Sequence, residues 1–133
     1  MIAADETEDA MPDAMPDAMP DAMKDTGGIT GWHAHVYFDA GTKPAARALC
    51  EAAVARFGIA MGRMHDDPVG PHPMGSCQLS VAPEVFGEVI PWLVLNRGDL
   101  TVFVHAESGD HLPDHTRHVL WLGQSLALDL SIF

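Results

Sequence analysis

The feature that most constrains the fold is the order of six segments between residues 32 and 106. Two segments have the apolar spacing of helices, and four are short runs rich in apolar, β-branched or aromatic residues that predict strands. In chain order these are strand 32–38, helix 43–57, strand 59–65, strand 77–81, a helix that begins at Pro83, and strand 100–106. This is the order of the split βαβ unit. We therefore expect an α+β, ferredoxin-like βαββαβ sandwich with an antiparallel sheet in the strand order 4-1-3-2.

The two predicted helices carry start and stop signals. Thr42 is a suitable N-cap for the first helix, Pro44 fits its first turn, and Gly58 follows its last apolar position. In the second helix, Pro91 falls inside the apolar stripe. Proline removes a backbone hydrogen bond there, so we expect it to kink or shorten that helix.

A sheet with both helices on one face leaves its other face to be covered. A second subunit or the C-terminal segment 107–133 could supply the cover, and residues 118–122 predict a further short strand in that segment. The assembly that we expect is a homodimer in the form of a dimeric α/β barrel, since a second copy would then cover the open face.

The N-terminal segment differs from the rest of the chain. Residues 11–22 repeat Met-Pro-Asp-Ala three times, and a proline in every copy excludes a helix interior or a paired strand. Residues 1–26 carry eight acidic side chains and one lysine, so they hold −7 of the net charge of −12. Because this segment has little to bury, we predict a disordered acidic tail over residues 1–27 and one folded domain over residues 28–133.

Composition excludes several classes of partner. Outside the tail the chain is mildly acidic and has no basic stripe, which argues against nucleic acid. No stretch approaches the ~20 apolar residues of a membrane span, and the N-terminus lacks the basic start and apolar run of a signal peptide. Cys50 and Cys77 do not make a disulfide framework and are expected to be reduced, buried thiols. We therefore expect a cytoplasmic protein with no nucleic-acid or membrane partner.

Two histidines share one face of the first predicted strand. His33 and His35 are two residues apart, so both side chains leave the face that also carries Tyr37. The opposite face of this strand is apolar and better suited to the helices. A histidine pair on a solvated face would have the same spacing, so the pair alone does not establish a site.

The predicted topology brings a third histidine to this pair. In the 4-1-3-2 order the fourth strand lies antiparallel to the first, so the end of one meets the start of the other. His105 ends the fourth strand, and its parity matches the open face of the sheet. Imidazole is a common metal ligand. We therefore predict that His33, His35 and His105 bind one metal ion.

The remaining histidines lie in less regular segments. His72 is bracketed by two prolines and two glycines, in a rigid loop that would hold its imidazole with little loss of entropy. His115 and His118 lie in the turn before the last predicted strand. Ordinary turns with histidines facing water are equally consistent with both segments. We interpret His65 and His111 as surface residues.

Several separated segments, in the right order, resemble the DOPA 4,5-dioxygenase family. They are residues 32–38, 70–79, 93–100, 104–105 and 114–123, and the resemblance extends over residues 31–123 without the tail. It implies a non-haem Fe(II) extradiol dioxygenase that opens the ring of L-DOPA or a related catechol with O2. The expected product is a seco-DOPA that cyclises to betalamic acid, and cleavage at the 2,3 bond stays open. Zinc could replace iron in a purified sample, since both metals accept imidazole.

The resemblance gives roles to the histidines. His33, His35 and His105 would hold the Fe(II), and the residues 28–133 would be a catalytic domain. The reaction also needs a base and an acid, and His72 and His115 are free for these catalytic roles.

Four further side chains are assigned to the substrate. Tyr37 shares the histidine face and could form a hydrogen bond with it, and His118 is also a reserve metal ligand. Arg97 or Arg117 could receive the substrate carboxylate. Arg97 could equally end the second helix, where a cation suits the helix dipole.

The predicted ligand set departs from a common pattern. Oxygen-activating Fe(II) sites often combine two histidines with one carboxylate. Asp39, Glu107 and Asp110 lie near strand ends, but the sequence selects none of them. We therefore prefer three histidines.

Two other functions are consistent with the same sequence. A ferredoxin-like unit can be a non-catalytic module that binds a small ligand or a metal, and an enzyme of this fold can oxidise phenols without a metal. Oxygen uptake with a catechol would separate the three, because the module consumes none and the metal-free enzyme is indifferent to a chelator.

Overall fold

The computed structural model describes residues 23–133, and residues 1–22 of the predicted tail lie outside the described part. Its strands are β2 (Gly31–Phe38), β3 (Ala60–Met61), β4 (Gly75–Val81), β5 (Val102–Glu107) and β6 (Val119–Leu122). Its α-helices are α1 (Lys43–Phe57), α2 (Phe86–Asn96) and α3 (His111–Thr116). Short 3-10 turns lie at Thr26–Gly28, Pro83–Val85 and Leu130–Ile132.

The strands form one open antiparallel sheet in the order β3-β4-β2-β5-β6. If β2, β3, β4 and β5 are numbered 1 to 4 in chain order, they have the predicted 4-1-3-2 arrangement. The predicted strand over 118–122 is β6, which extends the sheet beside β5. The fold is thus a mixed α+β fold, as expected. The dimeric barrel stays a prediction.

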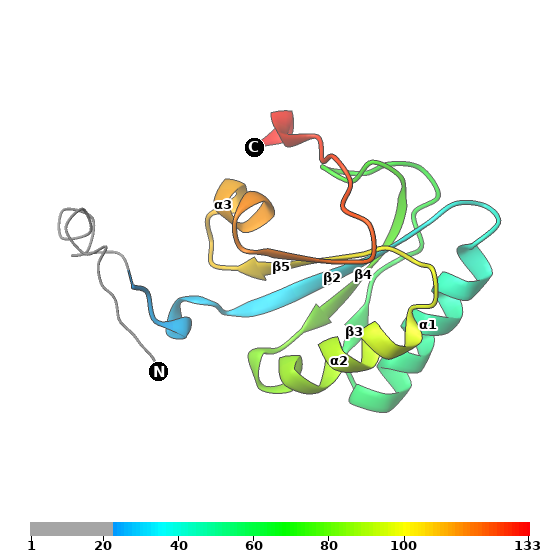
Figure 1. The fold of residues 1–133 in the computed structure, drawn as a ribbon, viewed down its shortest axis with the longest axis horizontal. Helices are drawn as coiled ribbons and strands as arrows, with labels where there is room; N and C mark the ends of the chain where they lie inside the picture. The colour runs from blue at the N-terminus through cyan, green and yellow to red at the C-terminus, as the bar shows by residue number, and fades with distance from the viewer. Residues whose placement is uncertain (1–22) are drawn as a thin grey trace, which may run out of the picture.

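Helices α1 and α2 cover one face of the sheet, whereas α3 and the C-terminal segment lie on the other side (Figure 1). The sheet residues that face α1 and α2 are almost all apolar and form the core with the buried stripes of both helices. The strands contribute Ala34, Val36, Phe38, Cys77, Leu79, Val81, Val102 and Val104, and the helices contribute Ala46, Leu49, Cys50, Ala53, Val89, Ile90 and Leu93. Both cysteines are buried free thiols, as predicted.

The ends of α1 show why it forms where the sequence predicted. Thr42 occupies the N-cap position, and its backbone N–H donates to Asp39 Oδ1 while Asp39 N–H donates to Thr42 Oγ1. Gly58 ends the helix with φ 68°, a conformation that favours glycine. In α2, Pro91 does not shorten the helix, which continues to Asn96. Proline removes the bond to the Gly87 carbonyl, and Gly87 is exposed, so water can satisfy that carbonyl.

The predicted strand over 59–65 is much shorter in the structure because it contains a β-bulge. Met61 pairs with Leu79 and His65 pairs with Ser76, so the segment 61–65 has one residue more than the segment 76–79 opposite it. Gly62 lies at the start of the bulge, as is common where a strand is interrupted. Because of the extra residue, the side chains that follow it in this segment point to the opposite face of the sheet from the one they would occupy in a regular strand.

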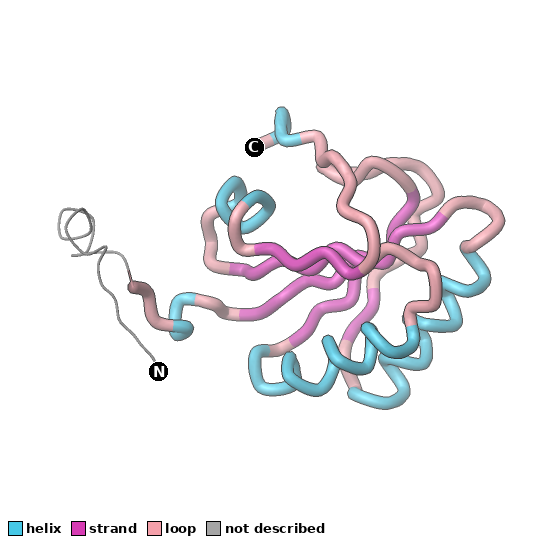
Figure 2. The backbone as a smooth tube through the Cα atoms, in the orientation of Figure 1, coloured by secondary structure: helices cyan, strands magenta, loops and turns pink. Residues whose placement is uncertain are grey.

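The C-terminal segment runs as a loop from β6 to the last 3-10 turn, above the sheet face that α1 and α2 leave open (Figure 2). The N–H of Asp129 donates to the Pro71 carbonyl at 2.9 Å, which attaches this segment to the loop containing His72. The sequence left open whether a second subunit or the C-terminal segment covers this face. The C-terminal segment therefore supplies part of the cover. No helix within residues 23–133 is long and apolar enough to cross a bilayer.

Candidate metal centre

The register of three strands assembles the polar face of the sheet. His33 pairs with His105, and His35 pairs with Phe103 across β2 and β5. On the other side of β2, His35 pairs with Gln78 of β4. Paired residues in an antiparallel sheet point to the same face, so these side chains all leave the face opposite α1 and α2.

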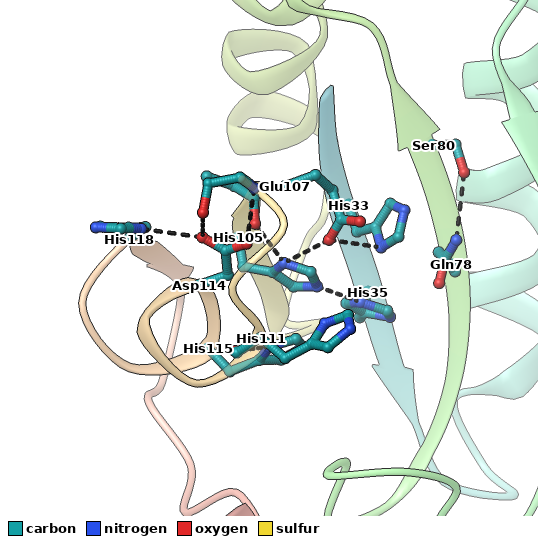
Figure 3. Close-up of polar contacts among 12 residues, drawn as sticks. His33, His35, Gln78, Ser80, His105, Glu107, His111, Asp114, His115 and His118 are labelled. Carbon is teal, nitrogen blue, oxygen red and sulfur yellow. Dashed lines mark hydrogen bonds and ion pairs between the residues drawn. The ribbon is translucent and has the colours of Figure 1, made fainter. Parts of the chain in front are cut away.

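Three histidines converge at the centre of this face, as predicted. His33, His35 and His105 each offer a nitrogen atom, and these atoms lie within 4.8 Å of one another. The residues His35 and His105 are only 4% and 1% exposed. Figure 3 shows their imidazoles meeting between β2 and β5.

The hydrogen bonds of His105 show how its ring is oriented. Its Nδ1–H donates to the Ala106 carbonyl at 3.0 Å, which leaves a lone pair on Nε2. That Nε2 lies 3.1 Å from Nε2 of His35. Two nitrogens bound at ~2.1 Å to one ion, at tetrahedral to octahedral angles, lie about 3.0–3.4 Å apart. The spacing of this pair therefore fits a shared cation.

One carboxylate, that of Glu107, lies next to two of the three histidines. Glu107 Oε2 is 3.3 Å from Nδ1 of His105 and 3.5 Å from Nδ1 of His33. A carboxylate that contacts the far nitrogen of a metal-binding histidine orients the ring and raises its basicity. The structure thus selects Glu107 from the three candidate carboxylates and places it beside two predicted ligands. By contrast, Asp39 is engaged at the start of α1.

Burial keeps these imidazoles neutral near pH 7. It lowers the pKa of His105 to about 4, and burial together with the nearby His72 and His105 holds the pKa of His35 well below its usual 6.5. Burial also lowers the pKa of His33, against the opposing effect of Glu107. Neutral imidazole is the form that binds metals, so the electrostatics favour a cation at this centre.

His72 lies beside the three histidines and does not face water. It is 8% exposed, its ring centroid is 4.1 Å from that of His35, and burial lowers its pKa to about 4. Its Nδ1 lies 2.8 Å from the hydroxyl of Tyr37, whose pKa is raised by burial. Tyr37 therefore sits on the histidine face as predicted, where it holds the ring of His72.

The short helix α3 brings two further histidines to this face. The ring of His115 lies 4.1 Å from that of His105, and its Nδ1–H donates to the His111 carbonyl at 2.7 Å. His111 was interpreted as a surface residue; it is exposed, but it also lines the cavity above the three histidines. Asp110 followed by Pro113 is a helix-start signal that could have identified α3.

A buried carboxylate attaches α3 to β5. Asp114 is 2% exposed and accepts hydrogen bonds from Ser108 N–H, Ser108 Oγ–H and His118 Nδ1–H at 2.7, 2.6 and 3.0 Å. Burial raises its pKa, but the bonds from Ser108 and His118 outweigh burial and leave the pKa below its usual value. Asp114 was not among the site residues predicted from the sequence. His118 is engaged here, on the far side of Asp114 from the three histidines (Figure 3).

The cavity above the histidines has a volume of about 210 Å³. Among the described residues it is lined by His33, His35, Pro71, His72, Gln78, His105, Glu107, His111, His115 and Phe133. Neither Arg97 nor Arg117 is in this set. The guanidinium of Arg97 donates to the Leu100 carbonyl at 2.9 Å at the end of α2, which matches its alternative role.

Comparison with known proteins gives three likenesses. Residues 32–132 match the Dopa 4,5-dioxygenase family. A DOPA 4,5-dioxygenase of Amanita muscaria is 36% identical in an alignment of 109 residues that covers 75% of this chain and 48% of that protein. A 21.2 kDa protein of Botryotinia fuckeliana, described as uncharacterized, is 44% identical in an alignment of 78 residues that covers 53% of this chain and 43% of that protein. The chain thus spans about half the length of these curated relatives.

A solved structure gives the same result for the fold. The crystal structure of a Nostoc punctiforme protein, for which a dioxygenase activity has been suggested, superposes with a TM-score of 0.80 at 47% sequence identity. The match covers 82% of this chain and 95% of the Nostoc protein.

Proposed function

The chain belongs to the Dopa 4,5-dioxygenase family, and we propose that it is an extradiol dioxygenase that cleaves L-DOPA or a related catechol with O2. The observation that carries this proposal is the group His33, His35 and His105, whose nitrogens lie within 4.8 Å of one another at the base of a cavity. A ring-opening dioxygenase needs a cation with open positions, and three neutral ligands on one side of an ion leave the cavity side for substrates.

The proposed reaction is balanced without any further reductant. A ring C–C bond beside the two hydroxyls breaks, and both atoms of O2 enter the product, one in a carboxylate and one in an aldehyde. The catechol supplies all four electrons that reduce O2. With L-DOPA the aldehyde can then condense with the side-chain amine and lose water, which gives a product of the betalamic-acid type.

The three histidines fit a divalent iron ion, and we assign them as its ligands. When bound, the iron would supply a Lewis acid that lowers the pKa of a catechol hydroxyl and a centre at which catechol and O2 meet. Glu107 would hold the rings of His33 and His105 in position. Zinc in a purified sample would fit the same nitrogens.

His72 is suited to move a proton in either direction. When its Nδ1–H donates to the Tyr37 oxygen, Nε2 is a base; when the Tyr37 hydroxyl donates to Nδ1, Nε2 carries the proton and is an acid. The lowered pKa of about 4 keeps the ring neutral, so both tautomers are accessible near pH 7. We propose that His72 accepts a catechol proton and later returns one to the opened ring.

His115 is placed for a second proton transfer. Because its Nδ1–H is held by the His111 carbonyl, the lone pair is on Nε2. The side chain lines the cavity next to His105. We propose that His115 accepts the second catechol proton or binds the substrate oxygen through a shared proton.

Oxygen uptake tests the proposed function. The metal-depleted protein should consume O2 with L-DOPA only after Fe(II) is added, at one O2 per L-DOPA, and should form a yellow product near neutral pH. The variant His105→Ala should be inactive, while His118→Ala, which changes a histidine outside the cluster, should stay active. No uptake with Fe(II) would favour the non-catalytic binding module, and uptake unaffected by a chelator would favour a metal-free oxygenase.

We also propose that the protein is a homodimer, since β3 and β6 leave two sheet edges and the C-terminal segment covers only part of the histidine face. Light scattering that gives the mass of a single chain would contradict this.

A further inference from the structure

A second cavity adjoins the histidine centre. It has a volume of about 180 Å³ and shares His35, His72 and Gln78 with the cavity above the histidines. The two cavities are therefore neighbours, and a molecule bound at the histidines has the second cavity next to it. What lines the far part of this cavity decides which substituent it accepts.

Arg63 reaches this cavity because of the β-bulge. In a regular strand Arg63 would share a face with Met61, which packs against the core beneath α1 and α2. The extra residue between Met61 and His65 changes this alternation, so that Met64 packs against the core and Arg63 lines the cavity on the histidine face. Bulges beside active sites commonly redirect a side chain in this way.

A buried hydroxyl lines the same cavity. Ser76 is 2% exposed and its backbone pairs with His65. Among residues 23–133 the side chains of its neighbours Cys77 and Gln78 bond elsewhere, and no side-chain hydrogen bond involves the Ser76 hydroxyl. Buried polar groups are rarely left without a partner, because desolvation without a compensating bond is costly. An acceptor group in the cavity would satisfy this hydroxyl.

Arg63 has no carboxylate within ion-pair distance in the described part of the chain. The acidic residue nearest to it along the sequence, Asp66, is bound by Lys43 at 2.6 Å. The guanidinium is therefore available for an anion.

The opposite side of the histidine centre cannot take that role. A third cavity of about 410 Å³ shares His33 and Glu107 with the histidine cavity, but Trp32 and Val81 line it and no lysine or arginine does among the described residues. Glu107 would repel an anion there.

We infer that the second cavity, lined by Arg63 and Ser76, binds the side-chain carboxylate of the catechol substrate. This inference rests on the proposed function. Arg63 donates to the carboxylate as an ion pair, and the Ser76 hydroxyl donates a further hydrogen bond. This site selects catechols that carry a carboxylate on the ring substituent and replaces Arg97 and Arg117 in the role that the sequence had suggested for them.

Steady-state kinetics with two catechols test this site. The Arg63→Gln variant should raise the KM for L-DOPA about tenfold with little change in kcat, because it removes an interaction made equally in the ground state and the transition state. The KM for 4-methylcatechol, which lacks the carboxylate, should not change. Arg63→Lys should recover part of the loss, and Ser76→Ala should raise the KM for L-DOPA alone. Arg56→Gln, at another arginine outside the two cavities, is the matched control.

Two results overturn the inference: an unchanged KM for L-DOPA in Arg63→Gln, or an equal rise for both catechols. If the wild-type protein turns over neither catechol, the proposed function fails, and calorimetry under nitrogen still tests the site. Metal-free wild type should then bind 3-(3,4-dihydroxyphenyl)propionate about tenfold more tightly than Arg63→Gln. Equal affinity, or no binding by the wild type, overturns it.

Discussion

Nε2 of His35 and Nε2 of His105 lie 3.1 Å apart, although the two residues are 70 positions apart in the chain. Adjacent strands bring them together, and the Ala106 carbonyl fixes the tautomer of His105, so that its lone pair is directed at its neighbour. Both rings are buried and neutral. Nε2 of His35 either donates a hydrogen bond to this lone pair or, in its other tautomer, binds one cation together with it, and the position of His33 favours the metal ion.

The role of His72 can be separated from metal binding. We expect His72→Ala to keep its iron and to lose turnover by about 10²- to 10⁴-fold, the usual contribution of a proton-transfer group. Tyr37→Phe should have a smaller effect, because it removes only the hydrogen bond to Nδ1 of His72. Iron content and kcat should be measured on the same samples. Loss of iron together with activity in His72→Ala would make His72 a ligand.

The buried histidines make the stability of the metal-free protein depend on pH. The pKa of His72 and that of His105 are about 4 in the folded protein, against an ordinary value of 6.5. Above 6.5 both groups are neutral in both states and contribute nothing. Between pH 6.5 and about 4 only the unfolded chain binds these protons. The free energy of unfolding therefore decreases as the pH decreases, on the order of 1 kcal/mol per pH unit for each histidine. Below about 4 both states are protonated and the loss stops growing.

Urea unfolding in the presence of a chelator, at pH 7.5 and pH 5.0, checks this dependence. The protein should be less stable at pH 5.0, and His72→Gln should show a smaller difference between the two values. Equal stability at both pH values in the unmodified protein would mean that these histidines are not buried as neutral groups.

Asp114 should matter more to stability than its neighbour Asp110. Asp114→Asn weakens three hydrogen bonds to a buried carboxylate, so we expect it to lower the free energy of unfolding by about 2 kcal/mol. Asp110→Asn should change it by less than ~0.5 kcal/mol, because Asp110 is exposed and makes no side-chain bond at the start of α3. The same urea experiment compares the two variants. Equal effects would show that Asp114 does not hold α3.

The strands and the first helix could be predicted because local patterns suffice there. The alternation of β2 assigns His33 and His35 to one face, and α1 has a proline near its start and a glycine after its end. Given the strand order, the parity of His105 then placed three histidines together. This part of the site required only the period of a strand and a common topology.

The remainder depends on contacts that no local pattern contains. The bulge that redirects Arg63 comes from one extra residue relative to β4, and the buried ring of His72 is held by contacts with Tyr37, His35 and Phe103. The burial of Asp114 depends on how α3 packs against β5. Tertiary register decides all three, so the sequence offered Arg97 or Arg117 for the substrate carboxylate and left Asp114 unassigned.

The metal content of two matched variants tests the central claim most directly. Purified protein loaded with Fe(II) under nitrogen should bind one iron per chain, His105→Ala should bind none, and His118→Ala should bind as the wild type does. Stoichiometric iron in His105→Ala, with an unchanged fold by circular dichroism, would contradict the claim that His33, His35 and His105 form the metal centre.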